Sequence, residues 1–293
     1  MRQAGIVAAR LKESRPGLEI ETVVIKTTGD RMQGVALAKI GGKGVFVKEI
    51  EEALLRGDID IAVHSLKDVP SEMPAGLEIG AVPQREDPRD ALISREGKKI
   101  DELRREGRIG TGSLRRGVQL RHWAPHLEIV PIRGNLDTRI RKLRTEDLDA
   151  IVVAAAGLSR LGLTDRITQY FPPEVIVPAI GQGALAVEWR SGDGRTRELA
   201  AGLNHPPSFT AATAERAFLR VFGGGCQLPI AAHAEISGGR LEITGFVGSL
   251  DGERIIRDSL AGAAVDAESI GQELALLILE SGGRKVLEEV ENG

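Results

Sequence analysis

The chain has 293 residues, a formal net charge of −3, and 42% hydrophobic and 28% charged residues, a composition typical of a globular protein with room for two or three domains. Its single cysteine excludes an internal disulfide, and no Cys/His cluster offers a zinc site, so we expect no metal. It has no run of about 18 apolar residues and no apolar signal core at its start, which predicts a cytoplasmic protein without a membrane span.

The first part of the chain alternates between helical and strand patterns. Residues 4–14 and 45–56 predict helices, and residues 18–25 and 58–63 predict strands. The segment 64–70 follows the second strand, at its C-terminal end. Lys67 and Asp68 lie side by side there: Asp68 is either a general acid or an ordinary turn residue, and His64 is expected to be structural.

The same alternation continues in the middle of the chain. Helices are predicted at 113–123 and 135–144, and strands at 127–131 and 149–154. This alternation predicts an α/β fold with parallel-rich sheets covered by helices on both faces. Functional groups in such sheets collect beyond the C-terminal ends of the strands. By this interpretation four loops lie at strand ends, namely residues 64–70, 110–113, 133–135 and 155–160.

Arginine is concentrated between residues 104 and 166. A guanidinium group favours two-pronged binding of carboxylate or phosphate, whereas aromatic residues, at 3%, are scarce for base stacking, so we expect small anions and no nucleic acid. The segments 110–116 and 133–139 each place glycine and a polar cap before arginines at a helix start. Each is either an anion site or an ordinary helix cap with solvated arginines; their joint presence favours the anion site.

The last part of the chain predicts a small α+β domain. A helix is expected at 209–222 and another at 267–280, with strands at 230–236, 240–248 and 253–260 between them. The loop before the first of these strands holds Cys226 after three glycines. A lone cysteine is most often a small buried hydrophobe, but a loop without bulky side chains suits a sulfur that a large group must reach.

In this order, the motifs resemble those of the porphobilinogen deaminase (hydroxymethylbilane synthase) family. Any one of them would be weak evidence, but the ordered set covers nearly the whole chain. The motifs are residues 41–46 (GGKGVF), 64–70 (HSLKDVP), 85–91 (REDPRDA), 110–116 (GTGSLRR), 133–135 (RGN), 178–183 (PAIGQG) and 223–230 (GGGCQLPI).

The resemblance implies two lobes like those of periplasmic binding proteins and a third domain that carries the cysteine. The expected division is 1–83 with 184–204, then 84–183, then 205–293. It also implies a dipyrromethane cofactor joined to Cys226 by a thioether, and a monomeric enzyme of haem biosynthesis. Such an enzyme deaminates four porphobilinogen molecules, condenses them head to tail and releases hydroxymethylbilane.

The resemblance also implies roles for individual residues. Asp68 would be catalytic, handling protons and stabilising the cation left by ammonia loss. Because every pyrrole unit carries acetate and propionate groups, cationic and hydroxyl side chains would bind them. The expected cofactor-binding residues besides Cys226 are Lys43, Ser65, Lys67, Thr111, Ser113, Arg115 and Arg116. The expected substrate-binding residues are Phe46, Arg133, Arg139, Arg160 and Gln182.

Two departures from the family pattern and two alternatives stay open. Gly112 stands where serine is common, and the chain begins inside the first helix, without the strand and the Arg/Ser pair that usually precede it. Either the start is assigned too late, or the chain is an impaired family member. The other alternative is a two-lobed protein that binds a small anion without chemistry, which would leave the third domain unexplained.

Overall fold

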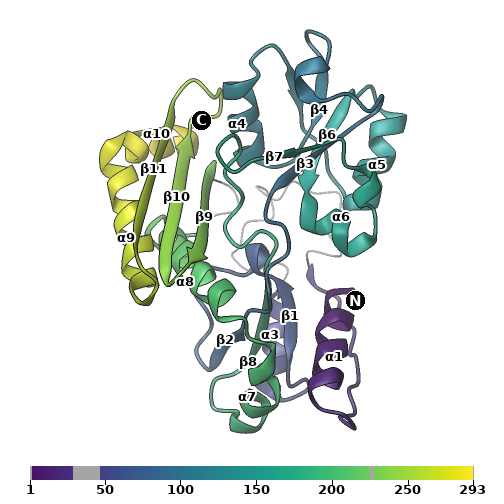
Figure 1. Cartoon of the computed structure of the whole chain (residues 1–293), viewed down its shortest axis with the longest axis vertical. Helices are drawn as coiled ribbons and strands as arrows, with labels where there is room; N and C mark the ends of the chain where they lie inside the picture. The colour runs from purple at the N-terminus through teal and green to yellow at the C-terminus, as the bar shows by residue number, and fades with distance from the viewer. Residues whose placement is uncertain (1, 29–46, 225–227, 293) are drawn as a thin grey trace.

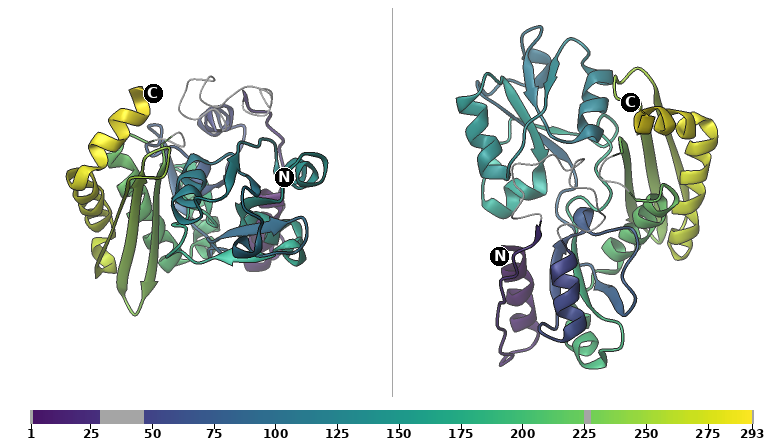
Figure 2. Two further views of the ribbon diagram at one scale, coloured as in Figure 1. Left: turned by 90° about the horizontal axis from the view of Figure 1, so that it is seen from above. Right: turned by 180° about the vertical axis from the view of Figure 1, so that it is seen from behind.

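The structure is a computed structural model that describes residues 2–28, 47–224 and 228–292. Figure 1 shows three bodies: a lobe at the bottom that holds the N-terminus, a second lobe above it, and a C-terminal domain at the side. The view from behind in Figure 2 shows the same three bodies. The predicted architecture of two α/β lobes and a C-terminal α+β domain is confirmed.

The first lobe has a three-stranded sheet in the order β1–β8–β2. The central strand β8 pairs antiparallel with both neighbours. Trp189 and Val187 on β8 are buried against Val7 and Leu11 of the first helix. The elements of this lobe are β1 (Ala62–Ser65), β2 (Leu77–Ala81), β8 (Leu185–Arg190), α1 (Arg2–Ser14), α3 (Lys48–Arg56) and α7 (Gly194–Ala200).

The second lobe has a five-stranded sheet in the order β5–β4–β6–β3–β7. The β4–β5 and β4–β6 pairs are parallel, whereas β3 is antiparallel to β6 and β7. Apolar clusters cover both faces of this sheet. Its elements are β3 (Asp90–Ser94), β4 (Arg108–Gly110), β5 (Glu128–Val130), β6 (Ala150–Ala154), β7 (Gln169–Phe171), α4 (Leu114–Trp123), α5 (Leu136–Thr145) and α6 (Ala155–Leu161).

The C-terminal domain packs helices on one antiparallel sheet, in the order β11–β10–β9. Phe218 and Leu274, from the two longer helices, are fully buried against this sheet. Two tight turns join the strands, as the glycines at 238 and 239 and at 252 predict. The elements are α8 (Pro206–Val221), β9 (Ile230–Ser237), β10 (Arg240–Gly248), β11 (Ile255–Ala263), α9 (Ala267–Ile278) and α10 (Arg284–Asn292).

Parallel strand pairs occur only in the second lobe among the described strands. In the first lobe β8 returns from the second lobe and runs between β1 and β2 in the opposite direction, so both of its pairs are antiparallel. The chain therefore crosses between the lobes twice, after β2 and before β8. Both crossings lie next to α8 of the C-terminal domain, since Arg85 and Gly181 each bond to Glu215.

Three expectations about single elements are wrong. Residues 18–25 form no strand, because no described strand pairs with them. Residues 155–160, expected as a loop, lie in the helix α6 (Ala155–Leu161), since alanine favours a helix and Gly162 at φ +69° ends it. Residues 58–61 precede β1 instead of belonging to it, because pairing with β8 begins only at Ala62, and the Ile59 carbonyl accepts a hydrogen bond from the Arg190 side chain.

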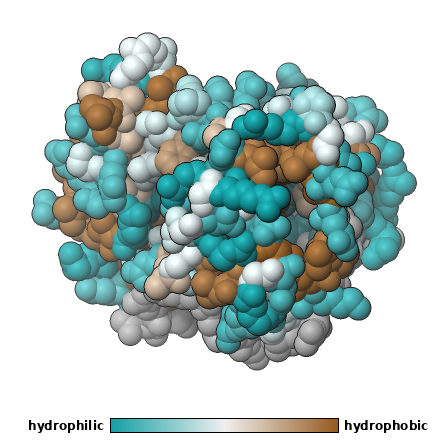
Figure 3. Space-filling model, turned by 90° about the horizontal axis from the view of Figure 1, so that it is seen from below, coloured by the Kyte–Doolittle hydropathy of each residue, from teal (hydrophilic) through white to brown (hydrophobic). Residues whose placement is uncertain are grey.

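The lower face of the molecule is a mixture of polar and apolar side chains (Figure 3). No helix in the part of the chain that the structure describes combines the length and the apolar character needed to cross a bilayer.

Candidate active site

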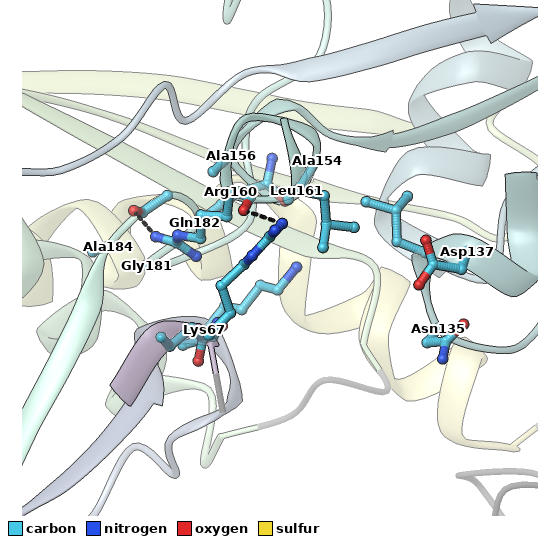
Figure 4. A pocket seen from close by; sticks show the side chains of 16 residues that line it. Lys67, Asn135, Asp137, Ala154, Ala156, Arg160, Leu161, Gly181, Gln182 and Ala184 are labelled. Carbon is cyan, nitrogen blue, oxygen red and sulfur yellow. Dashed lines mark hydrogen bonds between the residues drawn. The ribbon is translucent and has the colours of Figure 1, made fainter. Parts of the chain in front are cut away.

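A cavity of about 310 Å³ lies where the two lobes and the second crossing meet. Ser65 and Lys67 line it from the first lobe, and Asp137 and Arg160 from the second. The crossing contributes residues 181–184. Figure 4 shows side chains from all three parts around the same space. Of the predicted site residues, the cavity brings together Ser65, Lys67, Arg160 and Gln182.

Lys67 occupies a one-turn helix directly after β1, η2 (Leu66–Asp68). Burial lowers the pKa of its ammonium group, and the adjacent Asp68 carboxylate partly offsets that effect. Asp68 itself is exposed, beside the cavity residues but not among them. The start of the helix α1 lies against the end of β1, since Gln3 Nε2 donates a hydrogen bond of 2.6 Å to Ser65 Oγ.

Arg115 and Arg116 at the start of α4 point into the lobe, toward Asp90 on β3. Arg115 Nη1 lies 2.6 Å from Asp90 Oδ2, and Arg116 Nε lies 2.7 Å from Oδ1. All three residues are buried. Burial alone would raise the pKa of Asp90, but the two guanidinium charges and their hydrogen bonds hold it far below its usual range. Neither arginine lines the cavity, so in this structure both bind Asp90 and not a group inside the cavity.

Gln182 connects the crossing to this buried ion cluster. Its side-chain amide donates to the Pro88 carbonyl and to Asp90 Oδ1, at 2.7 and 2.9 Å. Its amide oxygen accepts a hydrogen bond from Arg116 Nη2 at 3.1 Å. The residue is 1% exposed. Gln182 therefore fixes the orientation of the crossing relative to the arginine pair.

The other predicted arginines lie at the ends of helices in the second lobe. Arg160, in α6, donates through Nη2 to the Gly183 carbonyl at 2.6 Å, and burial lowers its pKa. Arg139, in α5, donates through Nε to the Gly134 carbonyl at 2.8 Å, and burial lowers its pKa too. Arg133, just before α5, is exposed. Arg139 and Arg133 are not among the residues that line the cavity.

The two predicted hydroxyl residues act within the turn that leads into α4. Ser113 is the N-cap of α4, and its Oγ accepts the Arg116 backbone N–H at 3.4 Å. Thr111 is buried, and its Oγ1 accepts the Ser113 backbone N–H at 3.3 Å. The predicted cap at α5 is confirmed as well, since Asn135 Oδ1 accepts the Thr138 N–H at 2.9 Å. Cys226, Lys43 and Phe46 lie outside the described residues.

Sequence reasoning assigned no role to Asp90, Glu215 or Asp137. Asp90 belongs to the 85–91 motif, but nothing in the pattern showed that it would meet Arg115, 25 positions away. Glu215 had a signal, because it is a carboxylate on the apolar face of α8, between Ala211 and Phe218. Buried carboxylates are rare without a partner, so this position predicts a buried ion pair.

Two family descriptions match the chain. One, "Porphobilinogen deaminase, dipyromethane cofactor binding domain", covers residues 1–198, and the other, "Porphobilinogen deaminase, C-terminal domain", covers residues 209–280. Porphobilinogen deaminase of Syntrophobacter fumaroxidans is 50% identical over 290 residues, covering 99% of this chain and 94% of that protein. Porphobilinogen deaminase of Syntrophus aciditrophicus is 54% identical over 287 residues, covering 98% of this chain and 94% of that protein.

A third relative, porphobilinogen deaminase of Pelobacter propionicus, is 52% identical over 288 residues, covering 98% of this chain and 93% of that protein. Identity at this level extends through both lobes and the C-terminal domain. The chain belongs to the porphobilinogen deaminase family.

Proposed function

We propose that this chain is a hydroxymethylbilane synthase, a transferase of tetrapyrrole biosynthesis that condenses four porphobilinogen molecules head to tail with loss of ammonia. The observation that carries the proposal is identity of 50–54% to porphobilinogen deaminases over at least 98% of the chain. A binding protein without chemistry is disfavoured, because the likeness includes the C-terminal domain as well as the two lobes.

The residues around the cavity fit a dipyrromethane with its carboxylate groups. The Nε atom of Arg160, which lines the cavity, is buried and has no hydrogen-bond partner among the described residues. Buried donors without a partner are costly, so they favour an added acceptor such as a carboxylate oxygen. When bound, the dipyrromethane supplies the pyrrole carbon to which the first substrate is joined.

We assign the cofactor carboxylates to Lys67, Ser65, Thr111, Ser113, Arg115, Arg116 and Lys43, and the covalent thioether to Cys226. Arg133, Arg139, Arg160, Gln182 and Phe46 are assigned to the substrate. For Arg115, Arg116 and Gln182 the support is indirect. Their side chains bind Asp90 and one another, so they set the shape and positive charge of the wall behind Lys67.

Asp68 is proposed as the group that handles protons during amine loss. It is exposed beside the cavity and next to Lys67, where it can accept a proton or hold one at its carboxylate for the departing amine. The same negative charge stabilises the cation that amine loss leaves on the substrate. The proposal also includes three predictions from the sequence. They are domain boundaries at residues 83/84, 183/184 and 204/205, a monomeric state and a cytoplasmic location.

Intact mass of the purified chain, before and after incubation with porphobilinogen, tests the proposal. A dipyrromethane adduct that grows by pyrrole units is expected. The Cys226→Ser variant should fold, judged by circular dichroism, and carry no covalent adduct. A pyrrole covalently attached to that variant would rule out Cys226 as the anchor, and an unmodified wild-type mass in both samples would overturn the function for this chain.

A further inference from the structure

Asp137 places a negative charge on one wall of a cavity whose other charged residues are cations. It lies in the first turn of α5 and lines the cavity with its neighbour Leu136. Figure 4 shows its carboxylate and the Lys67 ammonium group pointing into the same space from opposite sides. The cavity therefore has an acidic side and a basic side.

The Asp137 carboxylate is not used by the fold. Among the residues that the structure describes, no hydrogen bond or ion pair involves it, and the cap of α5 is made by Asn135 instead. The nearest arginine in the same helix, Arg139, donates through Nε to the Gly134 carbonyl. A carboxylate in the first turn of a helix interacts favourably with the helix dipole. That interaction does not explain why Asp137 lines a cavity opposite a cation.

The Asp137 carboxylate can be reached by a ligand. Asp137 is exposed, and the apolar residues Leu136, Leu161 and Ala156 line the same cavity. A small ligand that carries both an ammonium group and carboxylates would satisfy both kinds of charge around the cavity.

We infer that Asp137 binds the primary ammonium group of incoming porphobilinogen, while Arg160, the cavity arginine assigned to the substrate, binds a carboxylate of the same molecule. This inference rests on the proposed function and adds a specificity-determining residue to it. The two contacts together would admit the monopyrrole in one orientation. Because Asp137 interacts with the charged amine before it leaves, its contribution is to substrate binding, whereas that of Asp68 is to the chemical step.

Steady-state kinetics of Asp137→Asn separates these roles. With the charge removed and the shape kept, KM for porphobilinogen should rise about tenfold while kcat stays within about twofold. Asp137→Glu, which keeps the charge, should recover most of the loss. Asp101→Asn is the matched control, because Asp101 is an exposed carboxylate in the same lobe, in η3 (Ile100–Glu102), and does not line the cavity.

A competitive inhibitor identifies the group that Asp137 contacts. The probe is a pyrrole that keeps the acetate and propionate groups but carries a methyl group in place of the aminomethyl group. Its Ki should be the same for the wild-type enzyme and Asp137→Asn, within about twofold, because it has no cation to lose. A Ki that shifts in parallel with KM would overturn the inference, and so would an unchanged KM.

The proposed function and this inference fail in different ways. If the wild-type chain gains no covalent pyrrole and turns over no porphobilinogen, both are overturned. If the wild type carries the adduct and turns over normally while Asp137→Asn keeps the wild-type KM, only the inference is overturned. Intact mass of Asp137→Asn, expected to show the same adduct as the wild type, confirms that the kinetic change does not come from cofactor loss.

Discussion

Gly181 donates its backbone N–H to Glu215 Oε2 at 2.6 Å, which joins the second crossing between the lobes to the C-terminal domain. The other carboxylate oxygen, Oε1, accepts hydrogen bonds from Arg85 in the first crossing and from the Ala234 N–H on β9, at 2.6 and 2.8 Å. Glu215 is fully buried. One carboxylate thus holds both crossings and the C-terminal sheet in a fixed arrangement around the cavity.

The charge of Glu215 makes the stability of the fold depend on pH in the acid range. Burial alone would raise its pKa, but Arg85 and the His233 ring, 3.5 Å away, lower it to about 2. Because the pKa in the folded state is below the unfolded value, this stabilisation is fully present above pH ~4.5 and is lost as the pH falls toward 2. Glu215→Gln should lower the free energy of unfolding at pH 7 by about 3 kcal/mol, since it leaves the largely buried Arg85 side chain without its counter-ion.

Urea unfolding at pH 7 and at intervals down to pH 3 measures this effect. The wild type should lose stability over the acid range, and Glu215→Gln should show a smaller loss there. Asp147→Asn is the control, because Asp147 pairs with Arg108 on the exposed surface, where an ion pair contributes less than about 1 kcal/mol. Parallel stability curves for the wild type and Glu215→Gln would show that another group carries the pH dependence.

A side chain at position 181 should disturb the segment that carries Lys67. Gly181 has φ +71°, and an added Cβ would lie 2.8 Å from Leu66 Cγ and 3.0 Å from the Lys67 backbone nitrogen. Gly181→Ala should therefore cost about 1–3 kcal/mol in backbone strain and displace η2. A displacement of about 1 Å at a catalytic group can cost about 10²-fold in rate, so we expect kcat to fall by that order.

Gly192→Ala is the matched control for this change, because Gly192 has no positive φ and an added Cβ there meets no atom within 4 Å. Its unfolding free energy and kcat should stay near those of the wild type. Thermal unfolding and initial rates, measured on both variants, make the comparison. Wild-type kcat in a folded Gly181→Ala variant would mean that the close contact with η2 is not needed for catalysis.

Local pattern in the sequence predicted much of the fold, because caps and periodicity act within a few residues. Ser113 and Asn135 cap α4 and α5 as their spacing indicates. What local pattern could not predict is which distant groups meet. Two adjacent arginines at a helix start look like an anion site, but Asp90 reaches them from the strand β3 and takes up their hydrogen bonds.

The strand expected at residues 18–25 is a second case in which local pattern could not predict the contacts between distant residues. Its alternating pattern is suited to a sheet, but a strand also needs a neighbour to supply hydrogen bonds, and none of the described strands pairs with it. Asp137 was missed because a carboxylate in the first turn of a helix is common and needs no ligand. Only its position opposite Lys67 in the cavity distinguishes it.

Asp68→Ala tests the proposed division of roles between carboxylates. Asp68 is exposed, so its removal should leave the unfolding free energy within about 0.5 kcal/mol of the wild type. A positioned proton-transfer group contributes about 10²–10⁴-fold, so kcat should fall by that factor while intact mass still shows the covalent adduct. Asp101→Ala, an exposed carboxylate away from the cavity, serves as the control. If Asp68→Ala kept a kcat within tenfold of the wild type, another group would have to handle the proton of the departing amine, and Asp137, the carboxylate that lines the cavity, would be the next residue to test.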